Sequence, residues 1–149
     1  MRRNTLIAII SLCLGSSAFG LASLVMLGNP TINVQTTADR QNGVTISHQT
    51  LNVTAKAGQN TQLQVRASGN LISGANSIPI NTLFIQITAP IVGTEIQTST
   101  VNQTLFLQKF NSSISNQPLT IKYRLATSAA LSGPAGAYTT VLTFTITQI

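Results

Sequence analysis

Groups able to carry catalysis are scarce in this chain, which has only two acidic residues, Asp39 and Glu95, and one histidine, His48, among 149 residues. Acid–base and nucleophilic catalysis need a nucleophile beside a base, or a pair of carboxylates. The two acids fall in separate expected loops, and no serine lies in a strained nucleophile elbow. The sequence therefore predicts that the protein is not an enzyme and uses no cofactor.

Cysteine and tryptophan are nearly or wholly missing, since Cys13 is the only cysteine and the chain has no tryptophan. A single cysteine excludes a disulfide within the chain. Three widely spaced His, Asp and Glu side chains do not make a usual zinc site, and the sequence has no acidic cluster for calcium. We expect no metal site, and a core built mainly from aliphatic side chains.

Charged residues of either sign make up only 7% of the chain, and the formal net charge of +6 comes from bases that are scattered singly after Arg2 and Arg3. Proteins that bind nucleic acid usually cluster their bases and combine them with stacking aromatic residues. We therefore predict no nucleic-acid partner, and at most a weak attraction to anionic polymers at a surface.

The N-terminal segment has the pattern of an export signal. Two arginines precede an uncharged stretch whose apolar part begins at Leu6 and is followed by small residues. Such a segment is typical of a secretory signal peptide. We predict a signal helix over residues 1–22, with Gly20 and Ala22 as the cleavage residues; the alternative is an uncleaved membrane anchor that extends to about residue 28. In both cases the rest of the chain is secreted or at the cell surface, and it contacts membrane only through this segment.

The remaining residues, 30–149, show the two-residue alternation of β-strands and form one expected domain. In the closing segment Tyr138, Leu142, Phe144 and Ile146 share one face, and the other face is mostly threonine. Alternation with β-branched and aromatic residues favours a half-buried strand over a helix. About seven to nine such strands, separated by polar turns, predict an all-β fold, an antiparallel β-sandwich with no helix after the signal.

The expected elements follow one another along the chain. Strands are expected at residues 31–36, 44–47, 51–55, 62–67, 83–88, 105–110, 119–125 and 138–147. Polar turns or loops are expected at residues 38–43, 56–60, 68–77, 93–100, 111–118 and 126–136. The pair Asn42 and Gly43 predicts a hairpin turn.

Three Asn-x-Ser/Thr sequons, at Asn52, Asn102 and Asn111, are candidate glycosylation sites. Asn52 is expected on the outward face of a strand and the other two in loops. An archaeal or eukaryotic host attaches glycans to such sites, whereas a sequence rich in Thr and Asn also contains these triplets by chance.

The closing strand resembles that of secreted pilin-like domains of the chaperone–usher and spore-coat-U types. In that family a turn glycine precedes an alternating strand; Gly136 takes the glycine's place, and Tyr138, Leu142, Phe144 and Ile146 match the alternation. The chain departs from the family by having Gln148 in place of an aromatic residue and by lacking a disulfide.

Residues 78–83 and 135–139 look like parts of WxL-type cell-wall domains, although the tryptophan that defines those domains is missing. Together the two resemblances imply an immunoglobulin-like or pilin-like sandwich at a cell surface. The pilin-like resemblance also implies assembly by strand exchange, with the matching residues of the closing strand as the assembly strand.

We therefore expect a non-enzymatic, exported structural or adhesive protein, of the pilus, fimbria or coat type, that assembles with itself or with other surface subunits through strand edges. In this hypothesis residues 21–27, freed by cleavage, insert into a neighbouring subunit; the alternatives are that they are the tail of an anchor or form the first strand of their own sheet. The alternative is an extracellular carbohydrate- or cell-wall-binding module. It would use the loops at 68–77 and 93–100, with Phe84, Phe106 and Phe110 as the aromatic candidates.

Overall fold

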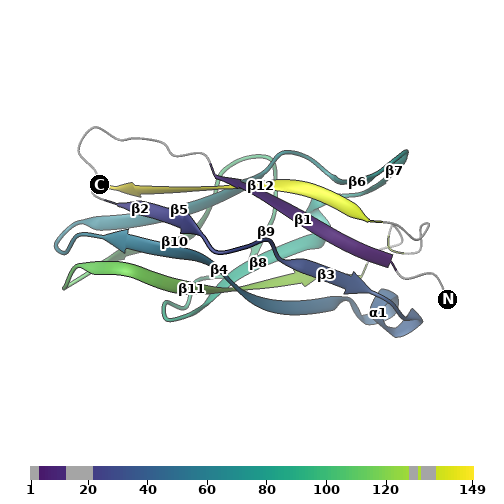
Figure 1. Cartoon of the computed structure of the whole chain (residues 1–149), viewed down its shortest axis with the longest axis horizontal. Coiled ribbons are helices and arrows are strands. Elements are labelled where there is room, and N and C mark those ends of the chain that lie inside the picture. The colour runs from purple at the N-terminus through teal and green to yellow at the C-terminus, as the bar shows by residue number, and fades with distance from the viewer. Residues whose placement is uncertain (1–3, 13–21, 128–130, 132–136) are drawn as a thin grey trace.

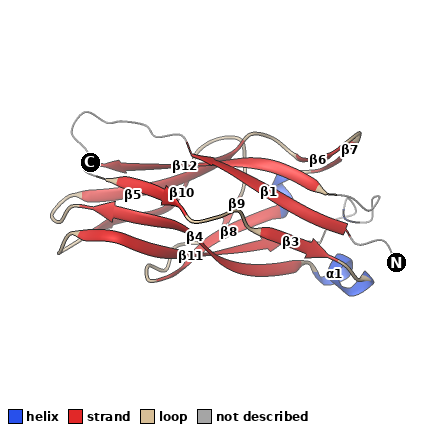
Figure 2. Cartoon of the chain, in the orientation of Figure 1, coloured by secondary structure: helices blue, strands red, loops and turns tan. Residues whose placement is uncertain are grey.

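The computed structural model describes residues 4–12, 22–127, 131 and 137–149, with side chains from residue 22 onward. Its strands form two sheets that pack face to face (Figure 1), and strands dominate the described chain (Figure 2). The predicted all-β sandwich is therefore confirmed. The described residues form more strands than expected, because two loops of the prediction and the N-terminal segment contain strands of their own.

The first sheet has seven strands in the order β10-β5-β12-β1-β3, with β6 and β7 attached beside β12. These strands are β1 (Asn4–Leu12), β3 (Thr31–Val34), β5 (Asn60–Ala67), β6 (Leu71–Ser73), β7 (Asn76–Ile78), β10 (Gln103–Lys109) and β12 (Tyr138–Gln148).

The second sheet has five strands in the order β2-β4-β11-β8-β9. They are β2 (Ser23–Met26), β4 (Val44–Ala55), β8 (Leu83–Ala89), β9 (Ile96–Gln97) and β11 (Ile114–Leu125). The short helices α1 (Thr37–Asn42) and η1 (Ile80–Thr82) lie between strands. All strand pairs among the described residues are antiparallel except the pair of β1 with β12.

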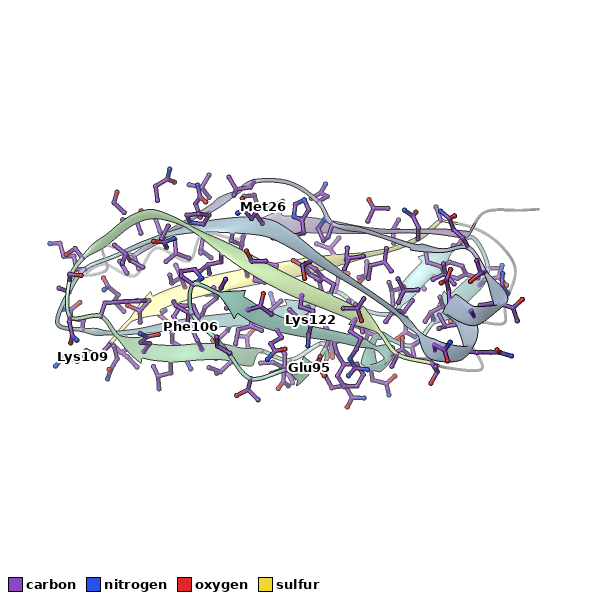
Figure 3. The ribbon with its side chains drawn as sticks, turned by 90° about the horizontal axis from the view of Figure 1, so that it is seen from below. Met26, Glu95, Phe106, Lys109 and Lys122 are labelled. Atoms are coloured by element: carbon purple, nitrogen blue, oxygen red, sulfur yellow. The ribbon has the colours of Figure 1, made fainter. Side chains whose placement is uncertain are left out.

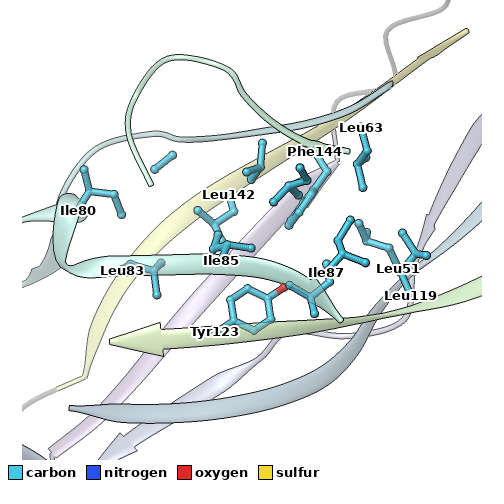
Figure 4. Close-up of a cluster of buried hydrophobic side chains, with 14 of the residues drawn as sticks. Leu51, Leu63, Ile80, Leu83, Ile85, Ile87, Leu119, Tyr123, Leu142 and Phe144 are labelled. Atoms are coloured by element: carbon cyan, nitrogen blue, oxygen red, sulfur yellow. The ribbon is translucent and has the colours of Figure 1, made fainter. Parts of the chain in front are cut away.

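The core lies between the sheets and follows the predicted alternation. On β12 every second residue from Tyr138 to Ile146 is buried, as expected. Leu63, Leu142 and Phe144 from the first sheet meet a larger group from the second (Figure 4). The labelled members of that group are Leu51, Leu83, Ile85, Ile87, Leu119 and Tyr123. Each fully buried aliphatic or aromatic side chain stabilises the fold by about 1.5–3 kcal/mol relative to exposure.

Residues 4–12 do not form the helix expected for a signal segment but the strand β1. It runs parallel to β12 over seven residue pairs, from Leu6 with Tyr138 to Leu12 with Phe144. On its other side it pairs antiparallel with β3. Strand pairing on both sides satisfies backbone N–H and C=O groups that a helix would satisfy internally, and the β-branched isoleucines of this segment suit a strand.

Residues 38–43, expected to be a hairpin turn, instead form most of helix α1 and its C-cap. The side chain of Thr36 accepts a hydrogen bond from the Asp39 amide (3.0 Å), and the Asp39 carboxylate accepts one from the Thr36 amide (2.8 Å). This reciprocal pair is a capping box, which favours the start of a helix. Gly43, with φ of 77°, ends the helix, and a Cβ there would lie 2.4 Å from the Leu125 carbonyl oxygen.

Two expected breaks in the second sheet are continuous strand. The strands predicted at 44–47 and 51–55 form the single strand β4, in which a bulge beside Leu119 and Thr120 leaves Thr50 buried. Likewise β11 begins at Ile114, inside the predicted loop 111–118. Pro118 is accommodated because β8 pairs with β11 only from Thr120 onward, so that the proline lies on an open edge.

Two other predicted loops contain short strands. Residues 68–77 include the β6–β7 hairpin, and residues 93–100 include β9. The predicted turn glycine, Gly136, lies outside the described residues. The strands predicted at 62–67, 83–88 and 138–147 agree with β5, β8 and β12 to within two residues at each end.

Candidate functional site

The strand predicted for assembly, β12, lies in the middle of the first sheet. It pairs antiparallel with β5 from Leu142 with Ala67 to Gln148 with Thr61, and parallel with β1 on its other side. The side chains of Tyr138, Leu142, Phe144 and Ile146 point into the core, so they hold the strand in place and leave its backbone for pairing. Gly136 lies outside the described residues.

The place of β1, between β12 and β3, is called the β1 position below. Within the described residues β3 pairs with no strand other than β1. Ile32 and Val34 of β3 are nevertheless buried in the core. The attachment of β3 to the first sheet therefore depends on the strand that occupies the β1 position.

The segment after the predicted cleavage residues is already a strand of its own sheet. Gly20 lies outside the described residues, and Ala22 is half-buried just before β2. Strand β2 pairs antiparallel with β4, from Ser23 with Thr54 to Met26 with Leu51, and Leu24 is buried. Of the two expectations for this segment, the structure shows a strand of its own sheet and not a free segment, because Leu24 and its backbone find partners within the chain.

The two carboxylates are both held by specific partners. Glu95 accepts hydrogen bonds from Arg124 Nη2 (2.7 Å) and Nε (3.2 Å) and forms an ion pair with Lys122 Nζ (3.0 Å); Figure 3 shows Glu95 beside Lys122. Hydrogen bonds from Arg124, then from Lys122, lower the pKa of Glu95 to about 2. Hydrogen bonds from the amides of Gln35 and Thr36 lower the pKa of Asp39. Carboxylates held in this way stay ionised, which makes them unsuited to general acid catalysis.

His48 belongs to a polar chain within the second sheet. Its Nδ1 lies 3.2 Å from Thr50 Oγ1, which lies 2.8 Å from the hydroxyl of Tyr123. Tyr123 is fully buried, and this burial raises the pKa of its hydroxyl. Residues 22–127 and 137–149 bring no three His, Cys, Asp or Glu side chains together as a metal site. The sequence did not predict this row of hydrogen-bonded side chains, because Thr50 is buried only through the bulge in β4.

The three sequons differ in accessibility. Asn52 faces outward as predicted, but it is half-buried, and its Nδ2 donates a hydrogen bond to Asn116 Oδ1 (2.9 Å). Its strand lies between β2 and β11, with Val25 on one side and Pro118 on the other. Asn102 and Asn111 are exposed outside the strands, so these two retain the geometry of an acceptor site.

The aromatic candidates for sugar binding do not present free rings. Phe106 and Phe110 are buried and pack edge to face, with their centroids 6.4 Å apart. The guanidinium of Arg124 lies over the ring of Phe84, 4.1 Å from its centroid. Phe84, Phe106 and Phe110 therefore offer no free ring face on which a sugar could stack, as the carbohydrate-binding alternative requires.

A groove lies beside β10, at an outer edge of the first sheet. Residues 91–94 and 105–108 line this β10 groove, whose volume is about 360 Å³. Gly93 lies so close to β10 that a Cβ there would be 2.4 Å from the Leu105 carbonyl oxygen. The Gly93 amide donates to the Ile87 carbonyl (2.9 Å), and Gln86 Nε2 donates to the Gly93 carbonyl (2.9 Å). In the sequence, Gly93 is the only feature of this turn that points to the groove.

Comparison with known proteins leaves the family open. A scan against models of protein families finds none that matches this sequence, and a search among characterised proteins finds no relative. The resemblances to pilin-like and WxL-type domains therefore stay predictions. In the part of the chain that is described, no helix has both the length and the apolar character required to cross a membrane.

Proposed function

We propose that this protein is an exported, non-enzymatic subunit of a cell-surface structure, which assembles or adheres through the edges of its β-strands. One observation carries the proposal: the residues with the pattern of an export signal include residues 4–12, which occupy the β1 position. Cleavage at Gly20 or Ala22 would therefore remove a strand from the interior of a sheet.

The loss of that strand has a direct physical consequence. Backbone groups along β12 and β3 that pair with β1 would lose their partners. An unpaired backbone group that stays buried costs about 1–3 kcal/mol, and a row of such groups is a template for a strand from another chain. A subunit processed in this way gains stability when a partner supplies the missing strand.

The engagement of both carboxylates supports a structural role over a catalytic one. Glu95 is paired with Lys122 and Arg124, and Asp39 accepts hydrogen bonds from the amides of Gln35 and Thr36, just before α1. The described residues therefore hold no acid that is free to act as a catalytic base, and His48 is hydrogen-bonded to Thr50.

The test is to isolate the exported protein, determine its N-terminal residue by mass spectrometry, and examine its oligomers on denaturing gels before and after boiling. We expect an N-terminus close to Gly20 or Ala22, together with oligomers that resist detergent at room temperature. A variant in which both Gly20 and Ala22 are replaced by leucine is the matched control, because it should keep β1 and remain free of such oligomers. An intact N-terminus on a protein confined to the cytosol would overturn the proposal.

A further inference from the structure

The sandwich has an open strand edge on each of two opposite sides. Within the described residues β2 pairs only with β4, at one end of the second sheet, and β10 pairs only with β5, at one end of the first. Strand β10 contacts β8 and β9, whereas β2 contacts β12. Figure 3 accordingly shows Met26 of β2 and Phe106 of β10 on opposite sides of the molecule.

Exposed apolar side chains gather at these two edges. At the β2 edge, defined as residues 23–27, Val25 is 52% and Leu27 is 47% exposed. At the β10 groove, Val92 is 77% and Leu107 is 56% exposed. Of the exposed large hydrophobic residues that the structure describes, only three lie elsewhere, namely Ile72, Val101 and Ile149. Apolar residues grouped on an exposed edge, rather than scattered singly, indicate a contact surface.

The β10 groove also offers main-chain groups. Of its eight lining residues, only Thr94 and Gln108 have polar side chains. The polar atoms that the groove presents are therefore mainly backbone N–H and C=O groups, which an extended strand can pair with. The groove is suited to a strand with small or medium apolar side chains.

The strand directions of the two edges are complementary. Because β12, β5 and β10 alternate in direction, β10 runs the same way as β12, whereas β3 runs the opposite way. Figure 1 shows β2 leading into β3 along one direction. Two copies placed side by side in the same orientation would therefore present β2 of one copy antiparallel to β10 of the other.

Charge favours these edges as the place where two copies approach. The chain has a formal net charge of +6, so copies repel each other on average. Neither residues 23–27 nor the lining of the β10 groove contains a charged side chain, and the only base on β10 is Lys109 at its end. Strand edges in natural proteins are commonly protected by charges or proline, and both are missing along these two segments.

From these observations we infer that copies of this chain associate side by side, with the β2 edge of one copy lying in the β10 groove of the next. The inference rests on the proposed assembly function and names its partner, a second copy. The two surfaces differ, so the contact is heterologous and can extend into an open row of subunits. Edges this short are small beside a standard interface of about 1,200–2,000 Å², so the association should be weak and should depend on concentration.

The test compares Leu107→Lys and Val25→Lys with a matched control, Ile72→Lys, which places the same charge on the β6–β7 hairpin. Sedimentation velocity of the full chain over a range of concentrations measures the association. We expect each edge variant to need at least ten times the wild-type concentration for half-association, and the control to match wild type. Val92→Lys serves as a second variant of the groove, and circular dichroism checks that all of the variants are folded.

Mixing the two edge variants gives a sharper test of the inference. The Val25→Lys protein retains an intact β10 groove, and the Leu107→Lys protein retains an intact β2 edge. Their equimolar mixture should therefore form one-to-one pairs and nothing larger. The inference would be overturned if the Leu107→Lys protein associated as strongly as wild type. It would also be overturned if the mixture behaved like its two separate components. Neither variant alters the β1 position, so detergent-resistant oligomers and N-terminal processing test the proposed function separately.

Discussion

The two sheets differ in what completes them. The second sheet is built around β4 and β11, which pair along most of their length, and polar contacts link β11 to its neighbours, from Tyr123 to Thr50 and from Arg124 to Glu95. The first sheet has β1 in its interior, and its outer strand β3 depends on that one segment. The second sheet is therefore complete without residues 4–12, whereas the first is not. Under the proposed function, a partner strand would act at the β1 position.

The largest expected effect concerns the buried face of β12, the central strand of the first sheet. Phe144→Ala removes a fully buried ring from β12 and should lower the free energy of unfolding by about 3–5 kcal/mol. Urea denaturation of the full chain measures it. Thr145→Ala, on the outer face of the same strand, is the control and should change stability by less than about 1 kcal/mol. Equal effects of the two substitutions would contradict the buried face assigned to β12.

The next prediction addresses β3. Ile32 is 1% exposed and lies on a strand that only β1 joins to the sheet. Ile32→Ala should cost about 2–4 kcal/mol in the full chain. In protein that lacks residues 1–20 the cost should fall below about 1 kcal/mol, because β3 would then be detached. The same cost in both forms would show that β3 is held independently of β1.

A smaller effect is expected in the second sheet. Tyr123→Phe removes the hydroxyl that lies 2.8 Å from Thr50 Oγ1 and should cost about 1 kcal/mol, as for other buried hydrogen bonds. The cost should be the same with and without residues 1–20, since the second sheet does not contain β1. Thr50→Val in combination with Tyr123→Phe measures the coupling; strictly additive effects would mean that the two hydroxyls do not interact.

The smallest effect concerns pH. The pKa of Glu95 is about 2 in the folded protein and near 4.5 when unfolded, so the unfolded chain binds the proton more tightly. The stabilisation is therefore complete above about pH 4.5 and is lost as the pH falls toward 2. The group is partly exposed, and solvent screening limits the effect to about 1 kcal/mol.

Urea denaturation at several pH values between 2.5 and 6 tests this prediction. Glu95→Gln should reduce the loss of stability at low pH without abolishing it, because the lowered pKa of Asp39 acts in the same direction. An unchanged pH profile in Glu95→Gln would show that the ion pairs with Lys122 and Arg124 do not contribute. Removal of residues 1–20 should leave this pH dependence unchanged, because Lys122 and Arg124 belong to β11 of the second sheet and Glu95 to the turn before β9.

Strand identity could be predicted from the sequence where alternation was regular, as in β5, β8 and β12. The predictions failed where tertiary contacts changed the local choice. Residues 111–118 contain polar residues and a proline, yet β11 begins at Ile114 because β4 lies alongside and leaves Pro118 on an open edge. Residues 38–43 became helical because Thr36 and Asp39 cap each other.

Of the candidate site, the sequence predicted the closing strand, which is present as β12, whereas the export signal and assembly through strand edges stay predictions. It did not place residues 4–12 beside β12, and it did not decide whether residues 21–27 insert into a neighbour or pair within their own sheet, as β2 does with β4. Alternation states which side chains share a face, but it carries no information on which strands are neighbours. The β10 groove was not predicted either, since its two walls lie in separate segments that meet only when the sheets pack.

By itself the sequence determined the all-β class, the aliphatic core and the shortage of catalytic groups, because composition and two-residue periodicity depend only on the order of residues. The tertiary structure alone decided that β1 lies between β12 and β3 and that the apolar edges at β2 and β10 lie on opposite sides. These features depend on the pairing of segments far apart in the chain. Such pairing is set by long-range packing and backbone hydrogen bonding, which no local pattern contains.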